Sequence, residues 1–296
     1  MANVWDALKK HQSEPVQAES TTASPGAVPL AVPADVAVTP HPAGAAASSV
    51  SAPTNAPPLT APLPSTSVVP VTSPTARKPA AYSEELRPHF DRGGRIADAY
   101  RALRTNLLAK CGEKGFCYLV TSARGGEGKT ITSVNLALVL AECVTKNTLL
   151  IDADLRRPRV AGLMGLSAAP GLAELIRGEA AMKQVLQPTT YPNLSVISAG
   201  GATPESVAEL LARPPVASLL AEAKRMFDYV LIDTPPINHV SDVGTLGPFC
   251  RGALLVVRSG KTRQEDVDRA VALLHAANIQ PAGMVLTGSR GFAANG

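Results

Sequence analysis

The stretch TSARGGEGKT, Thr121 to Thr130, contains the residue types that hold phosphate groups in proteins. Its glycines let the backbone turn N–H groups toward phosphate oxygens, Lys129 would reach the β- and γ-phosphates, and the Thr130 hydroxyl would bind Mg²⁺. The usual spacing is Gly, four residues, then Gly-Lys-Ser/Thr, but Ala123 stands at the first glycine. We expect its small side chain to leave the loop open. The predicted nucleotide-binding residues are Arg124, Gly125, Gly126, Glu127, Gly128, Lys129, Thr130 and Ile131.

A second candidate stretch, TLLIDADLRRPR, carries two carboxylates, Asp152 and Asp154, at the end of an apolar run. Their side chains fall on the same side if the chain stays extended there. Beside a triphosphate, one carboxylate could take a proton from the attacking hydroxyl and the other could hold Mg²⁺ through water. Arg156 and Arg157 could hold phosphate or an acceptor group. Taken alone, strand-end carboxylates often cap helices, so the pair gains its meaning from the glycine-rich loop.

A third stretch, YVLIDTPP, ends four apolar residues with Asp233. An aspartate at this place is the usual metal-side carboxylate of P-loop proteins. The expected metal-supporting residues are therefore Thr130, Asp154 and Asp233.

The elements around these stretches indicate an α/β fold. Strand-length apolar runs (CYLVTS, TLLIDA, LSVIS, YVLID, ALLVV and GMVLT) alternate with helical patterns (ITSVNLALVLAECV, VAELLARPPVASLLAEAKRM and QEDVDRAVALLHAA). Apolar strands that alternate with helices predict a mostly parallel sheet with helices on both faces. Ligands bind such sheets at the carboxyl ends of the strands, which is where the three aspartates stand.

Composition divides the 296 residues into three regions. In residues 1–12, the apolar side chains have the spacing of a short amphipathic helix. This segment is interpreted either as a docking peptide or as a frayed end of the chain. Residues 13–80 are rich in Pro, Ala, Ser and Thr and have few large apolar side chains, which predicts a disordered linker. Residues 81–296 form the predicted P-loop domain.

Several functional classes are disfavoured by the same sequence. The net charge is +4, without a basic run, which is short of a nucleic-acid-binding signature. The four cysteines show no metal spacing and are interpreted as isolated thiols in a reducing compartment. No apolar run is long enough to span a membrane, and the N-terminus has no signal-peptide core. We expect a cytoplasmic protein.

Together, the three motifs resemble the deviant P-loop ATPases (the MinD/ParA-like group) and, within them, the bacterial tyrosine kinases (BY-kinases) of capsule and exopolysaccharide systems. The resemblance runs from about Arg95 to Leu286, with TSARGGEGKT as Walker A, LLIDADLRRP as Walker A′ and YVLIDTPP as Walker B. It implies ATP and Mg²⁺ as cofactors. Lys129 would act on phosphate, Asp152 would be the base toward a tyrosine hydroxyl, and Asp154 and Asp233 would support Mg²⁺. It also implies a membrane protein of polysaccharide export whose cytosolic tail activates the kinase, which would place the chain at the inner face of the plasma membrane.

The segment DAYRALR is similar to the helix by which subunits of this family pack into a ring. Asp98, Arg101 and Arg104 recur at helical spacing, so their side chains point one way. The resemblance implies a homo-oligomer. The alternative interpretation is a solvated charged face with local ion pairs.

The chain also departs from the family pattern. The family's C-terminal tail carries clustered tyrosines, whereas this chain has no tyrosine after Tyr229. Thr287 replaces an Asn near the adenine, and Arg124 replaces the signature Lys of the partition ATPases. We expect a tyrosine kinase acting on other proteins. Tyr118 and Tyr229 should be buried. Tyr82, at the junction with the linker, should be the most mobile tyrosine and is the preferred internal acceptor. The alternatives are a non-kinase ATPase switch on a membrane partner and a degenerate nucleotide-binding scaffold.

Overall fold

The structure is a computed structural model that describes residues 82–111, 115–201, 206–239 and 242–288. All of these ranges belong to the domain predicted for 81–296. The predicted N-terminal helix (1–12) and linker (13–80) lie outside the described residues.

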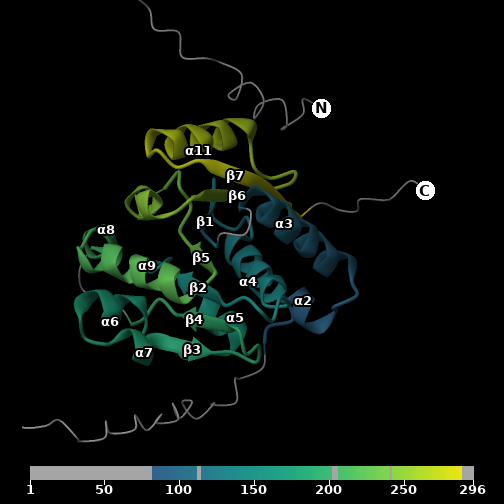
Figure 1. Cartoon of the computed structure of the whole chain (residues 1–296). Helices are drawn as coiled ribbons and strands as arrows, with labels where there is room; N and C mark the ends of the chain where they lie inside the picture. Colours follow the sequence, from purple (N-terminus) through teal and green to yellow (C-terminus); the bar gives the residue numbers. More distant parts are fainter. Residues whose placement is uncertain (1–81, 112–114, 202–205, 240–241, 289–296) are drawn as a thin grey trace, which may run out of the picture. The chain divides into compact units, whose positions relative to one another are not determined.

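A single sheet runs through the domain (Figure 1), with strand order β3-β4-β2-β5-β1-β6-β7. All neighbouring strands are parallel except the β3–β4 pair, which is antiparallel. The strands are β1 (Phe116–Ser122), β2 (Thr148–Asp152), β3 (Leu186–Pro188), β4 (Leu194–Ile197), β5 (Tyr229–Asp233), β6 (Gly252–Arg258) and β7 (Pro281–Thr287). Every residue of β1, β2 and β5 is buried, as expected for central strands covered on both faces.

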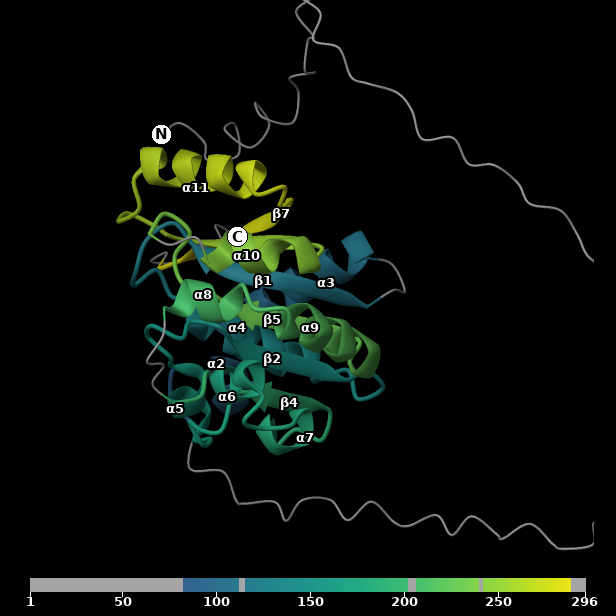
Figure 2. The same cartoon turned by 90° about the vertical axis from the view of Figure 1, so that its left-hand side faces the viewer.

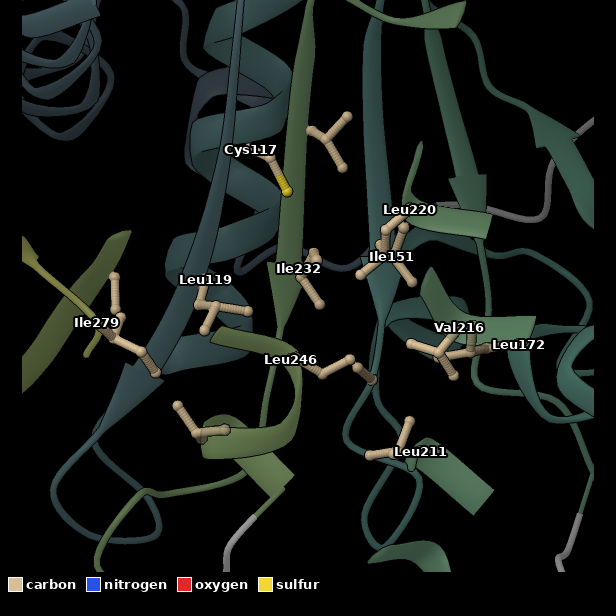
Figure 3. Close-up of a cluster of buried hydrophobic side chains, with 14 of the residues drawn as sticks. Cys117, Leu119, Ile151, Leu172, Leu211, Val216, Leu220, Ile232, Leu246 and Ile279 are labelled. Carbon is tan, nitrogen blue, oxygen red and sulfur yellow. The ribbon is translucent and has the colours of Figure 1, made fainter. Parts of the chain in front are cut away.

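Helices cover both faces of this sheet, as Figures 1 and 2 show. The helices of the first layer are α2 (Arg87–Phe90), α3 (Arg95–Cys111), α4 (Lys129–Leu140) and α5 (Val160–Met164). Those of the second layer are α6 (Leu172–Arg177), α7 (Met182–Val185), α8 (Val207–Leu211), α9 (Pro215–Met226), α10 (Asp242–Leu246), the 3-10 turn η1 (Gly247–Phe249) and α11 (Gln264–Ala276). Each layer has its own apolar core. Figure 3 shows part of the second core, with Leu119, Ile151 and Ile232 projecting from the central strands.

The predicted α/β class is confirmed, and each expected strand is present within one or two residues of its predicted ends. The expected single helix over 207–226 is wrong, because it is two helices: α8 ends at Leu211 and α9 starts at Pro215. Proline has no N–H to donate to the preceding turn, so Pro214 and Pro215 cannot continue a helix, although proline suits a first turn. The antiparallel edge strand β3 was not predicted, since LQP is too short to carry a pattern.

Candidate functional site

The glycine-rich loop joins the end of β1 to the start of α4. Gly126 and Gly128 have φ of 80° and 90°, a left-handed conformation that glycine adopts without steric cost. Ala123 does not need that freedom, because among the described non-glycine residues Asn278 alone has a positive φ. Ala123 is also fully buried against the core. The loop therefore keeps its turn without the missing first glycine.

Glu127 closes the loop by side-chain bonds within the protein. Its Oε2 accepts the Arg124 backbone N–H at 2.9 Å, and its Oε1 accepts the Thr262 hydroxyl. Its carbonyl accepts the Thr287 hydroxyl at 2.6 Å. Glu127 is among the predicted nucleotide-binding residues, and its side chain points into the protein, with 4% of the residue exposed. It braces the loop against the segment after β6 and the end of β7.

Arg124 also points away from the loop. Its Nη1 lies 3.2 Å from Oδ2 of Asp266 in the first turn of α11, and half of the side chain is exposed. This ion pair borders an open hollow beside α11, so the structure places the Arg124 side chain outside the cavity that Lys129 lines.

The charged residues of the three motifs meet at the carboxyl ends of β1, β2 and β5. Lys129 Nζ lies 2.6 Å from Asp154 Oδ2 and 3.7 Å from Asp233 Oδ2. The Thr130 hydroxyl donates to Asp233 Oδ2 at 2.7 Å. Asp152 and Asp233 are direct neighbours in the β2–β5 register. The predicted juxtaposition of lysine, threonine and aspartates is therefore present.

Ser133 belongs to this group, and the sequence reasoning missed it. Its hydroxyl donates to Asp233 Oδ1 at 2.8 Å, so hydroxyls bind both oxygens of that buried carboxylate. Ser133 follows Lys129 by one helical turn, which was the available signal. Burial raises the pKa of Asp233, while Lys129 and the two hydroxyls oppose that rise.

Asp152 has a different environment. Its Oδ1 accepts the Asp154 N–H, and its Oδ2 accepts the N–H groups of Arg159 and Val160, each at 3.1 Å. The side chain is fully buried. Its three hydrogen bonds fasten the Walker A′ loop (residues 153–159) to the start of α5. Burial, with the neighbouring Asp233 charge, raises the pKa of Asp152 to about 7.

A cavity of about 510 Å³ opens over this group, within the size range of small-ligand sites. Asp154 lines it, whereas Asp152 does not. Asp242, which is fully buried, holds Arg156 with contacts of 3.1 and 3.3 Å. The lining residues are Gly125, Gly126, Gly128, Lys129, Thr130, Ile131, Asp154, Arg156, Arg157, Arg159, Pro235, Pro236 and His239. Arg159, His239 and the two prolines were not predicted as lining residues.

The oxygen atoms in this group suit Mg²⁺. Within the described parts of the chain, no group of three or more His, Cys, Asp or Glu side chains could hold a metal ion by itself. Mg²⁺ is usually bound by one or two carboxylates together with substrate phosphates and water, so a preformed cage is not needed. The Thr130 hydroxyl beside Asp154 and Asp233 fits that requirement.

The predicted assembly residues lie on α3 and bond within the chain. Both Arg101 and Arg104 contact Glu142, with the nearest atoms 2.6 and 2.9 Å apart. Arg101 also contacts Asp98 at 3.0 Å, and Asp98 is the most exposed of the three. The hydrogen bond from Arg101 lowers the pKa of Glu142, while burial opposes it.

The tyrosines are placed partly as expected. Tyr118 and Tyr229 are buried, which confirms that prediction. The expectation of a mobile Tyr82 is wrong, because its side chain is 7% exposed and its ring packs edge-on against His89. Its hydroxyl bonds to Thr190 at 3.0 Å. The Tyr82 ring is thus part of the apolar core, although the residue lies next to the predicted linker.

Similarity to known proteins extends over this domain. The ParA family model, described as NUBPL iron-transfer P-loop NTPase, matches residues 115–290. Tyrosine-protein kinase YwqD of Bacillus subtilis (strain 168) is 36% identical over 195 residues, covering 66% of this chain and 81% of that protein. The putative tyrosine-protein kinase CapB of Staphylococcus aureus is 32% identical over 192 residues, covering 64% of this chain and 83% of that protein.

The chain belongs to the bacterial tyrosine kinases, within the ParA-type P-loop NTPases. Solved structures are also similar to this chain. The kinase domain of Escherichia coli tyrosine kinase ETK matches with a TM-score of 0.65 and 30% identity, covering 71% of this chain and 84% of that one. The chimerical protein CapA2B2 matches with a TM-score of 0.65 and 26% identity, covering 69% of this chain and 89% of that one.

Family membership carries nucleotide binding with a divalent metal. Among the described helices, none combines the length and the hydropathy that a membrane span requires.

Proposed function

We propose that this kinase transfers the γ-phosphoryl group of Mg-ATP to tyrosine hydroxyls of protein substrates and thereby regulates capsule or exopolysaccharide synthesis. The observation that carries the proposal is the meeting of Lys129, Asp154 and Asp233 at one end of the sheet, in a chain 36% identical to a tyrosine-protein kinase.

Lys129 is the proposed phosphate-binding cation. In the structure its ammonium is bonded to Asp154, and 12% of the side chain is exposed. Phosphate oxygens would replace that carboxylate as the partner of the ammonium group. The N–H groups at the start of α4 and the positive end of the helix would bind the phosphates from the same side. Positioning and charge stabilisation of this kind supply most of the catalysis in phosphoryl transfer.

We assign the metal to Thr130, Asp154 and Asp233. Bound Mg²⁺ would neutralise charge on the phosphate oxygens. Ser133 would hold Asp233 in place from its second oxygen, since that hydroxyl is already bonded there.

We assign the base to Asp152. A pKa of about 7 suits a group that must take and release a proton near neutral pH. Because Asp152 is fully covered, a tyrosine hydroxyl reaches it only when the Walker A′ loop moves. Asp154 already lines the cavity and is the competing candidate, so the two carboxylates need separate variants.

The proposed acceptors are tyrosines of other proteins. No tyrosine follows Tyr229 in the sequence, and Tyr82, Tyr118 and Tyr229 are buried, while Tyr100 and Tyr191 are partly buried. We further propose that the chain self-associates through α3 and works beside a membrane-bound polysaccharide co-polymerase, at the cytoplasmic face of the membrane. The resemblance of the three motifs to the kinases of capsule and exopolysaccharide systems supports a partner of this kind.

The lack of a tyrosine after Tyr229 also favours a second candidate, an ATPase switch that controls assembly on the membrane partner. The two are separated by incubating the chain, with and without the partner and candidate substrates, with ATP labelled at the γ-phosphate. Phosphoamino-acid analysis should then find phosphotyrosine, and none with Lys129→Met. Release of phosphate without any phosphotyrosine would replace the kinase proposal with the switch.

A further inference from the structure

Two thiols lie in contact at the amino end of β1, far from the nucleotide site. Cys117 is the second residue of β1, and Cys250 lies just before β6. Their sulfur atoms are 3.3 Å apart, although the residues are separated by 133 positions. The backbone adds to this approach, because the Arg251 N–H donates to the Cys117 carbonyl at 2.8 Å. Figure 3 shows the Cys117 side chain within the same core as Leu119 and Ile232.

The other two cysteines have different neighbours. The Cys111 sulfur lies 3.4 Å from the Tyr118 hydroxyl, and the Cys143 sulfur lies 3.6 Å from the Thr145 hydroxyl. All four thiols are free. Cys117 and Cys250 are thus a paired site, whereas Cys111 and Cys143 provide single thiols of the same chain for comparison.

The pair is accessible from one side and has a neighbouring cation. Cys250 is partly exposed and Cys117 is 3% exposed, so a small reagent meets Cys250 first. Lys224 donates to the Phe249 carbonyl at 3.0 Å, which holds its ammonium group next to Cys250 in the chain. The hydrogen bond with Cys250 lowers the pKa of the Cys117 thiol, Lys224 acts in the same direction, and burial opposes both. The same hydrogen bond and burial raise the pKa of the Cys250 thiol. Thiolate is the reactive form of cysteine, so Cys117 is the stronger nucleophile of the pair and Cys250 is the more accessible sulfur.

We propose that Cys117 and Cys250 are an oxidant-reactive dithiol that closes to an intramolecular disulfide when the chain meets a peroxide. In the first step the Cys250 sulfur attacks one peroxide oxygen, the O–O bond breaks, and one water leaves, which gives a sulfenic acid. The Cys117 thiolate then attacks the Cys250 sulfur, the S–O bond breaks, and the departing hydroxide takes up the proton that Cys117 lost on ionising, which gives a second water. Two thiols are oxidised and one peroxide is reduced.

Closure requires the two sulfurs to come closer. A disulfide brings its sulfurs to about 2.05 Å, so these two, now 3.3 Å apart, must approach by roughly 1.3 Å. The site lies apart from catalysis, because a strand rises about 3.3 Å per residue and Cys117 is therefore on the order of 17 Å from Ser122, where the nucleotide loop begins.

The expected consequence is a gain in stability without a loss of nucleotide binding. The disulfide would enclose residues 117–250, a loop that contains all three motifs of the site. Closing so long a loop restricts the unfolded chain more than the folded one. We expect the melting temperature of the oxidised chain to exceed that of the reduced chain by roughly 5–10 °C.

The test uses the full-length reduced chain, treated with hydrogen peroxide at micromolar protein concentration. Remaining thiols are then alkylated and the peptides identified by mass spectrometry. We expect one linked species that joins the Cys117 and Cys250 peptides, that loses the mass of two hydrogen atoms, and that dithiothreitol reverses. Cys143→Ser should leave the linkage and the rise in melting temperature unchanged, while Cys250→Ser should abolish both.

Two results would overturn the proposal. One is Cys250 oxidised to sulfinic acid while Cys117 alkylates as a free thiol. The other is a linkage that joins two chains or involves Cys143. If Cys250→Ser does not fold, the peptide linkage and its reversal in the wild-type chain still decide the question.

Discussion

The Lys129–Asp154 contact shows how single residues prepare this site. The ammonium and carboxylate are 2.6 Å apart and almost fully covered, so each compensates the charge of the other. Asp233 is fully buried and held by two hydroxyls. Charged groups at this depth are costly unless paired, which explains why both oxygens of Asp233 have donors.

For the phosphate site, we predict that Lys129→Met lowers ATP turnover by at least about 100-fold, because it removes the cation that stabilises developing charge on the phosphates. Circular dichroism should remain that of the folded wild type, with a small loss of stability from the unpaired Asp154. Lys261→Met, which removes an exposed lysine, is the matched control and should keep full turnover. Equal turnover in the two variants would contradict the assignment of the site.

A second residue-scale prediction concerns pH. The folded state raises the pKa of Asp152 to about 7, so the folded chain binds this proton more tightly than the unfolded chain does. Its contribution to the free energy of unfolding is complete below the unfolded pKa and is lost as pH rises through about 7. Urea unfolding of the nucleotide-free chain should therefore show less loss of stability between pH 5 and 7.5 in Asp152→Asn than in wild type, with a difference on the order of 2–4 kcal/mol. Identical slopes for the two proteins would show that Asp152 stays ionised.

At the scale of elements, ion pairs connect α3 to the end of α4. Glu142 follows α4 and accepts hydrogen bonds from both Arg101 and Arg104 of α3. In the described part of the chain, these arginines therefore hold α3 against the end of α4. A surface pair of this kind contributes about 0–1 kcal/mol, which an intersubunit partner could match. The same arginines can thus bind either Glu142 of their own chain or a carboxylate of a neighbouring subunit.

We predict that replacing both Arg101 and Arg104 by Ala shifts sedimentation toward monomer in the presence of Mg-ATP. Glu142→Gln separates the two roles of the arginines, since it removes the negative charge that both contact, while Arg101 keeps its contact with Asp98 and Arg104 keeps its bond to the Val139 carbonyl. It should retain or strengthen association while lowering stability slightly. A wild-type chain that stays monomeric with nucleotide at high concentration would refute self-association through α3.

At the scale of the whole molecule, the described domain contains the entire site and both apolar cores. The bonds that brace the nucleotide loop come from residues of this same domain. The docking helix predicted for 1–12 and the linker predicted for 13–80 remain predictions, since they lie outside the described residues.

Deletion of residues 13–80 should leave the melting temperature of the domain and its ATP turnover nearly unchanged, because that segment has little apolar surface to bury. Differential scanning calorimetry and a turnover assay on the shortened chain would measure this. A drop of more than a few degrees would mean that the segment packs on the domain.

Phosphosite mapping tests whether the acceptor tyrosine lies on another protein or within this chain. After incubation with ATP, we expect phosphotyrosine on a co-purified or added substrate protein and none at Tyr82, whose hydroxyl is bonded inside the fold. Tyr82→Phe should therefore leave the level of phosphotyrosine unchanged. A loss of most phosphotyrosine in that variant would mean that the segment around Tyr82 opens during turnover.

The sequence alone determined the class of fold, the loop and the strand ends that carry the aspartates. These features depend on local patterns: buried strands are continuous apolar runs, and a phosphate loop needs glycines beside a lysine at fixed spacing. Composition likewise set residues 81–296 apart as the region able to form a core. Local pattern also explains the one wrong helix, since the apolar spacing of 207–226 continued across two prolines that the backbone could not follow.

The tertiary structure alone decided which side chains meet. Glu127 turns to Thr262 and away from the cavity, and Arg101 and Arg104 find Glu142. Tyr82 enters the core, and Cys117 meets Cys250. Each of these partners is distant in the chain, whereas residue spacing reports only the face of a residue's own helix or strand. Packing of one element on another sets such contacts, because most buried polar groups are hydrogen-bonded and take their partners from whichever elements pack beside them.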